Sequence, residues 1–308
     1  MKINKVYVVL LLLALVAPFF LYPVFLAKLL CFALFACAFN LMLGYVGLLS
    51  FGHAAFLGTG GYVTGWLMMN SGMTPELAIL LGTVSAGALG AIYGKLSVKR
   101  EGIYFAMVTL ALSQLVFFIY LQAPFTGGED GMQGVPRGNL FGMIDLSDNI
   151  NMYYFVLAVF LFGFWLIHRT IHSPFGQVLK AIRENEPRAV SLGYNVNDYK
   201  WVAFTISAAL AGLAGSTKTL VFQLASLTDV HWHMSGEVVL MTLVGGVGTI
   251  LGPVVGAGVI VTMQNYLSGG ELGNYLHIIM GFIFVVCVLA FRSGIVGEFQ
   301  KVWKRNFG

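Results

Sequence analysis

Residues 24–43 read VFLAKLLCFALFACAFNLML, and Lys28 is the one charged side chain in this stretch. A helix needs about 20 consecutive apolar residues to cross the hydrocarbon core of a bilayer. Further runs with few or no charges cover residues 6–20 and 278–291. These stretches predict helices that cross a membrane, so lipid rather than water surrounds much of the chain.

The composition also indicates a membrane protein. Of the 308 residues, 58% are hydrophobic and 10% are charged, whereas soluble domains are about 25% charged. The cysteines Cys31, Cys37 and Cys287 lie inside apolar runs without ligand-spaced partners, which predicts small core side chains and no metal site. The formal net charge is +4. In a membrane protein, the positions of the basic residues indicate its orientation in the bilayer, so we expect no nucleic acid partner.

Clusters of Gly, Pro and charged residues divide the chain into about ten apolar segments. The segments cover residues 6–21, 24–44, 51–70, 77–96, 103–122, 152–168, 201–222, 237–250, 253–268 and 275–291. They predict an all-α, polytopic membrane fold with a single transmembrane domain over residues 1–308. Segments 237–250 and 253–268 are short, so they are either two spans or one broken or re-entrant pair.

The positions of the basic residues predict the orientation. An even number of crossings places both termini on one side of the membrane. With the N-terminus in the cytoplasm, every Lys and Arg except Lys28, Arg137 and Lys218 falls on the inner side. We therefore expect an N-in and C-in topology, with Lys218 extending to the outer interface.

Two hydrophilic connections are long: residues 123–151, expected outside, and residues 168–200, expected in the cytoplasm. Ser173 and Pro174 in the inner connection are typical of a helix start. Apolar residues then recur at helical spacing, at Phe175, Val178, Leu179 and Ile182. The inner connection therefore contains a short amphipathic helix.

Pro187 should end or break this helix and leave a second short turn that reaches Gly193. The apolar face of the helix needs a cover, which the chain's own helices, the lipid surface or another subunit could provide. Glu184 and Glu186 would oppose anionic lipid. The sequence therefore slightly favours a protein partner.

Three stretches carry a family resemblance. Residues 173–193 read SPFGQVLKAIRENEPRAVSLG, residues 40–56 read NLMLGYVGLLSFGHAAF, and residues 242–253 read TLVGGVGTILGP. In this order they resemble the LivM-type permease subunits of branched-chain amino acid ABC transporters, and the similarity spans nearly the whole chain. The first stretch is similar to that family's coupling loop.

The resemblance implies that this loop seats in a groove of a separate ATPase subunit. Glu186, Ala189 and Gly193 match the Glu-Ala-Ala-x-x-x-Gly pattern of ABC permeases, whereas Pro187 and Arg188 depart from it. The residues implied in coupling are Ser173, Pro174, Phe175, Gly176, Ala181, Ile182, Arg183, Glu184, Asn185, Glu186, Ala189 and Gly193. The sequence has no G-x-x-x-x-G-K-[ST] phosphate loop, so we expect a transporter subunit that is not an enzyme, has no cofactor of its own and relies on ATP bound by partner subunits.

Small and polar residues within the apolar segments are candidates for the solute pathway or for helix packing. They are Gly44, Gly47, Ser50, His53, Gln114, Gly245, Gly246 and Gly248. His53 could cap a helix, face the pathway or contact a neighbouring subunit. Glycines spaced four apart, as at Gly61 and Gly65 or at Gly90 and Gly94, are expected mainly to let helices approach closely.

These observations predict the permease subunit of an ATP-driven importer for branched-chain or related amino acids, in the bacterial inner membrane. By resemblance, its partners are a second related permease subunit, two cytoplasmic ATPase subunits, an extracytoplasmic solute-binding protein and membrane lipid. One alternative keeps the family and changes the solute to urea, short amides or aromatic acids. An ion-coupled secondary carrier would need titratable groups at mid-depth, and a membrane-embedded transferase would need a polar catalytic cluster; neither is evident.

Overall fold

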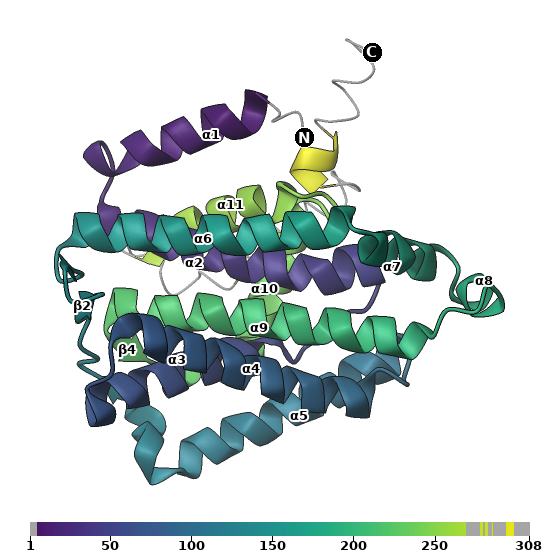
Figure 1. Ribbon diagram of the computed structural model, residues 1–308, viewed down its shortest axis with the longest axis horizontal. Coiled ribbons are helices and arrows are strands. Elements are labelled where there is room, and N and C mark those ends of the chain that lie inside the picture. The colour runs from purple at the N-terminus through teal and green to yellow at the C-terminus, as the bar shows by residue number, and fades with distance from the viewer. Residues whose placement is uncertain (1–4, 269–277, 280, 283–284, 286–293, 299–308) are drawn as a thin grey trace.

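The computed structural model describes residues 5–268, 278–279, 281–282, 285 and 294–298, and helices dominate it (Figure 1). The helices are α1 (Lys5–Val16), α2 (Pro23–Asn40), α3 (His53–Ser71), α4 (Pro75–Ser97), α5 (Gly102–Gln122), α6 (Asn149–His172), α7 (Pro174–Glu184), α8 (Glu186–Ser191), α9 (Val196–Phe222), α10 (Trp232–Gly245) and α11 (Gly252–Ser268). The strands are β1 (Met132–Gln133), β2 (Asn139–Leu140), β3 (Ile144–Asp145) and β4 (Leu224–Ala225). These short strands lie in the connections, so the predicted all-α class holds for the bundle.

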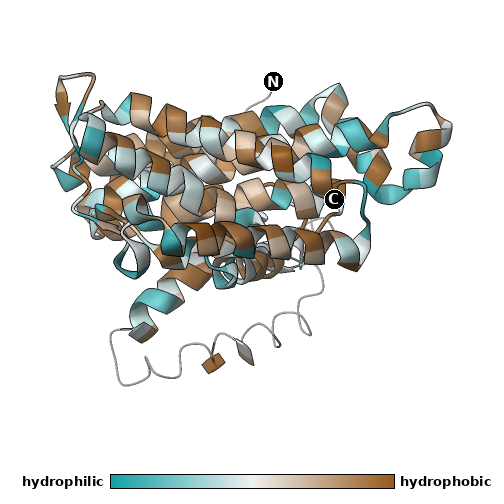
Figure 2. Cartoon of the chain, turned by 90° about the horizontal axis from the view of Figure 1, so that it is seen from below, coloured by the Kyte–Doolittle hydropathy of each residue, from teal (hydrophilic) through white to brown (hydrophobic). Residues whose placement is uncertain are grey.

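Five helices in the described part of the chain are long and apolar enough to cross a membrane. They are α2 with the π-helical turn Leu41–Val46 that extends it, α4, α5, α6 and α9. The predicted segment at 275–291, together with Cys287, falls mainly outside the described residues. Figure 2 shows hydrophobic residues along the helices and hydrophilic residues on the protruding α7 and α8.

α9 is the central helix of the bundle, and it packs against α2, α3 and α4. Small residues make these contacts close. A Cβ atom on Gly60 would lie 2.2 Å from the carbonyl oxygen of Gly212, and one on Gly90 would lie 2.2 Å from the Cβ of Ala208. Because lipid provides no hydrophobic force between helices, close backbone contact of this kind stabilises their association. Gly90 is one of the glycines predicted to let helices approach closely, and it does so here, whereas Gly60 is an additional position of the same kind.

α10 and α11 pack against each other. Ala225, just before this pair, pairs with Met132 of the connection between α5 and α6. Gly248, in the turn between the two helices, lies instead beside Gly44 and the α7 residue Arg183. Residues 225–248 therefore traverse the bundle, and α11 returns. Neither α10, with 14 residues, nor α11, with 17, is among the five long apolar helices of the described chain.

Arg137 attaches the connection between α5 and α6 to the far end of α9. Its Nη2 donates to the carbonyl oxygen of Val221 at 2.8 Å, and its Nε donates to that of Leu220 at 3.3 Å. The last carbonyls of a helix lack partners within the helix. A cation that binds them also interacts favourably with the helix dipole. Arg137 thus explains why the connection folds back onto the bundle.

Candidate functional site

The connection between α6 and α9 begins with a well-defined helix start. The hydroxyl of Ser173 accepts a hydrogen bond from the backbone N–H of Gly176 at 3.3 Å, and Pro174 occupies the first turn of α7. A side chain at Gly176 would collide with the carbonyl oxygens of Thr170 and Ile171, both 2.4 Å from its Cβ position. A new helix therefore begins directly after α6, as the Ser-Pro pair predicts.

The apolar face of α7 packs on the chain itself. Leu179 is 0% exposed and Ile182 is 3% exposed. Phe175 stacks on Tyr199 of α9, with ring centroids 5.5 Å apart. Of the three covers considered for this face, the chain's own helices provide it, and the expectation that favoured a partner there is wrong.

α7 and α8 are separated at Asn185, two residues earlier than predicted. The Asn185 side chain accepts from the N–H of Arg188 at 3.0 Å and so caps α8. Pro187 lies in the first turn of α8, where a missing N–H costs nothing because that group has no intrahelical partner. Pro187 therefore helps to begin the second helix rather than to end the first.

α8 is anchored on one side and exposed on the other. Ala189 is 2% exposed, and Glu186 accepts from the Nζ of Lys200, at 2.5 Å, at the start of α9. Val190 and Leu192, by contrast, are 57% and 69% exposed. Val190 of α8 and Leu192 directly after it therefore present apolar side chains to their surroundings at the outermost point of the bundle (Figure 1).

Arg183 joins α7 to the first glycine turn. Its Nη1 donates to the carbonyl oxygen of Gly44, near the end of the π-helical turn that extends α2. Its aliphatic stem lies against Gly47, whose Cβ position would be 3.1 Å from Cγ of Arg183. Lys180, one turn earlier on α7, sits 5.9 Å from the ring centroid of Tyr45. The basic side of α7 is thus attached to the end of α2.

The second glycine turn, between α10 and α11, meets the first at the same place. The side chain of Asn40 donates to the carbonyl oxygen of Thr249 at 2.9 Å and accepts from the N–H of Gly248 at 3.0 Å. A Cβ atom on Gly44 would lie 2.7 Å from the nitrogen of Gly248. The turns approach this closely because both positions are glycine. Arg183, Gly44, Gly47 and Gly248 therefore form one junction, which we call the glycine junction.

The remaining predicted residues do not all reach the glycine junction. Gly245 contacts Gly252, and Gly246 has a φ of 122° in the turn beside it. His53 is 0% exposed, its Nε2 lies 2.9 Å from the hydroxyl of Ser207, and it packs inside the bundle. The positions of Ser50 and Gln114 are also interior: Ser50 is buried and bonds to the N–H of Gly52, whereas Gln114 is half-buried in α5.

Residues 21–288 match the protein family described as the permease component of branched-chain amino acid transport systems. The chain belongs to this permease family. The predicted resemblance is therefore confirmed, and so is the expectation of a transport subunit rather than an enzyme. Membership of this family and the five long apolar helices together show that the permease is a multi-pass membrane protein.

Among its relatives, the permease is 26% identical over 280 residues to the high-affinity branched-chain amino acid permease protein LivM of Escherichia coli K12. That alignment covers 83% of this chain and 65% of LivM. It is 25% identical to LivH of the same organism over 295 residues, or 88% of this chain and 93% of LivH. It is 28% identical to the ribose import permease RbsC of Bacillus subtilis over 237 residues, or 73% of this chain and 71% of RbsC.

The chain thus spans about two thirds of the length of the LivM relative, which is covered to 65%. No solved structure matches the permease. Sequence reasoning found the glycines of the junction as family signatures but missed the ion pair of Lys200 with Glu186. A Lys at the start of an apolar segment, 14 residues after a Glu in a helical connection, was the available signal.

Proposed function

We propose that this permease is a transmembrane subunit of an ATP-driven ABC importer for branched-chain or related amino acids. The glycine junction carries the proposal. Arg183 connects the extramembrane helix α7 directly to the ends of α2 and of the α10–α11 pair. A displacement of α7 would therefore be transmitted to helices that run the length of the bundle.

In this proposal α8 and the residues after it bind the ATPase. The apolar face of α7 is already occupied by the bundle, whereas Val190, Leu192 and Tyr194 are 57%, 69% and 40% exposed. Exposed apolar groups rimmed by polar residues are typical of interaction sites. The ATPase would close around α8 and pull α7, and Arg183 would pass the movement to the glycine turns.

The proposal includes an orientation and a set of partners. With α7 and α8 in the cytoplasm, both termini lie inside, and about ten segments cross the inner membrane of a bacterium. The partners would be a second permease of the LivH kind, two ATPase subunits that bind ATP, and a solute-binding protein outside. LivM and LivH relatives of this chain support the paired permeases.

The solute is the less constrained part of the proposal. Relatives of this permease include ribose import permeases as well as branched-chain amino acid permeases. Urea, short amides and aromatic acids therefore remain alternative solutes within the same mechanism. We favour amino acids because the family model that matches residues 21–288 is described as the permease component of branched-chain amino acid transport systems.

Purification of the tagged chain from its native membrane tests the proposal. We expect nucleotide-binding subunits to co-purify, and the assembled complex in vesicles to take up leucine only with ATP and the binding protein. Uptake by the chain alone, driven by a proton or sodium gradient, would instead identify a secondary carrier.

A further inference from the structure

A cavity of about 340 Å³ lies at the end of the bundle opposite to α7. It is formed where α2, α9, α10 and α11 meet the loop that follows β4. Both signs of charge line it, from Lys28, Lys218, Asp229 and Glu237, and the rings of Phe32 and Phe222 form part of its wall. Its volume is within the range of pockets that bind small molecules.

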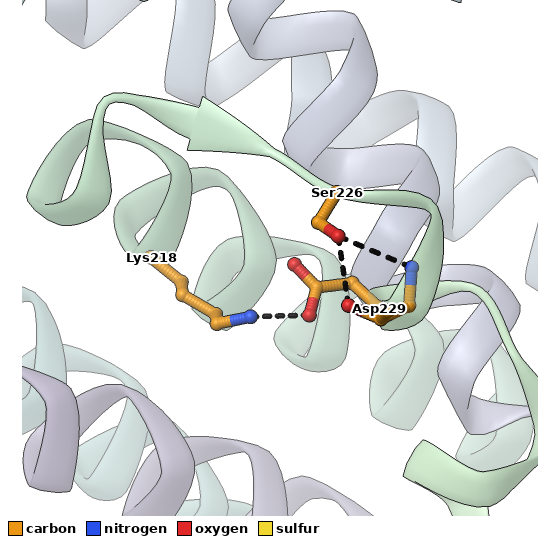
Figure 3. Close-up of polar contacts among 4 residues, drawn as sticks. Lys218, Ser226 and Asp229 are labelled. Carbon is orange, nitrogen blue, oxygen red and sulfur yellow. Dashed lines mark hydrogen bonds and ion pairs between the residues drawn. The ribbon is translucent and has the colours of Figure 1, made fainter. Parts of the chain in front are cut away.

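The first opposite-charge pair in the cavity is Lys218 with Asp229. The ammonium group of Lys218 donates to the carboxylate of Asp229, on the loop before α10 (Figure 3). Their side chains are 14% and 9% exposed. Lys218 also lies 5.5 Å and 5.9 Å from the ring centroids of Phe32 and Phe222. Lys218, which the sequence predicts to extend to the outer interface, thus has an anionic partner within the chain.

The second pair, Lys28 and Glu237, is not closed by a hydrogen bond. Lys28 on α2 and Glu237 on α10 are both half-buried and line the same cavity. In the part of the chain that the structure describes, neither Lys28 nor Glu237 makes a side-chain hydrogen bond. Charged groups within membrane-spanning helices are costly unless they are paired or serve a solute. Lys28 and Glu237 thus leave one cationic and one anionic position open to a ligand.

We propose that this cavity binds a zwitterionic amino acid with an apolar side chain. The α-carboxylate would lie by Lys28 and the α-ammonium group by Glu237, while Phe32 and Phe222 would contact the apolar side chain. The solute class rests on the proposed function, in which this end of the bundle faces outward. What the cavity contributes is the location of a solute site within the permease and the residues that would contact each group of the solute.

Equilibrium binding of radiolabelled leucine tests this site. The probe is added to the full-length chain, purified with its membrane partners in nanodiscs, without ATP or the binding protein. We expect saturable binding that is at least tenfold weaker in Glu237→Gln and in Lys28→Met. The matched control is Glu129→Gln, which removes an exposed carboxylate from the connection between α5 and α6 and should bind leucine as the native chain does.

Analogues that lack one charge identify the recognised groups. We expect 4-methylpentanoate and 3-methylbutylamine to compete with leucine at least tenfold less well than unlabelled leucine does. Absence of saturable binding, or native affinity in both variants, would overturn the proposal. Displacement of leucine by glycerophosphoethanolamine at equal concentration would also overturn it, because the cavity would then be a site for lipid headgroups.

The outcome separates this inference from the proposed function. ATP-driven leucine uptake without leucine binding to the cavity would refute the site and leave the importer intact. Leucine binding to the cavity without ATP-driven uptake would refute the importer and leave the site intact.

Discussion

Arg183 is the residue on which the glycine junction depends. Its guanidinium group binds the carbonyl oxygen of Gly44, which lies where a helical segment ends and carbonyls lack helical partners. A hydrogen bond from a charged donor to such a group contributes about 1.5–3 kcal/mol. The planar guanidinium also lies beside Gly248, whose Cβ position would be 3.0 Å from Nη1. One side chain therefore contacts both glycine turns.

We predict that Arg183→Glu lowers ATP-driven uptake at least tenfold while the protein still inserts in the membrane. The reversed charge would face the carbonyl oxygen of Gly44 and repel it. Uptake by reconstituted vesicles is the measurement, with Lys99→Glu as the control because Lys99 is exposed between α4 and α5. Equal uptake by both variants would remove Arg183 from the coupling path.

At the scale of elements, α7 and α8 divide two tasks between them. α7 buries Leu179 at 0% exposure against the bundle, whereas Leu192, directly after α8, is 69% exposed. The same residue type therefore stabilises the fold at one position and is available to a partner at the other.

Truncation of each leucine should separate the two tasks. Leu179→Ala should lower stability by about 2–5 kcal/mol through the cavity it creates, measured as a lower thermal unfolding midpoint. Leu192→Ala should change the free energy of unfolding by no more than a surface substitution does, about 0.5 kcal/mol. It should nevertheless weaken co-purification of the ATPase. Retention of native ATPase binding by Leu192→Ala would contradict the role given to α8.

The sequence predicts where helices lie along the chain better than it predicts which distant residues they contact. The Ser173 cap and the apolar spacing up to Ile182 locate α7, because both are set by residues a few positions apart. The sequence predicts the break at Pro187, whereas it lies at Asn185, because local rules do not decide whether a proline ends one helix or begins the next. The contact of Arg183 with Gly44 joins residues 139 positions apart, and no periodicity reports such a contact.

At the scale of the whole molecule, the bundle has two different ends. The glycine junction and the exposed α8 occupy one end, and the charged cavity of Lys28 and Glu237 lies toward the other. α9 connects them and is 27 residues long, or about 40 Å at 1.5 Å per residue. An importer needs this separation, since solute enters on one side and ATP is hydrolysed on the other.

Cysteine labelling in intact cells should establish the orientation. Ser147→Cys, exposed between α5 and α6, should react with a membrane-impermeant maleimide, whereas Ser191→Cys in α8 should react only after the membrane is opened. The native Cys31 and Cys37 are buried, so they should add little background. The reverse pattern of labelling would invert the proposed topology.

The most direct test of the account is photocrosslinking from α8 in native membranes. With benzoylphenylalanine in place of Leu192, we predict an adduct that contains the nucleotide-binding subunit. The same probe in place of Met143, which is 90% exposed at the other end of the bundle, should give no such adduct. Adducts from position 192 with lipid alone, in a complex that still transports solute, would contradict the claim that α8 binds the ATPase.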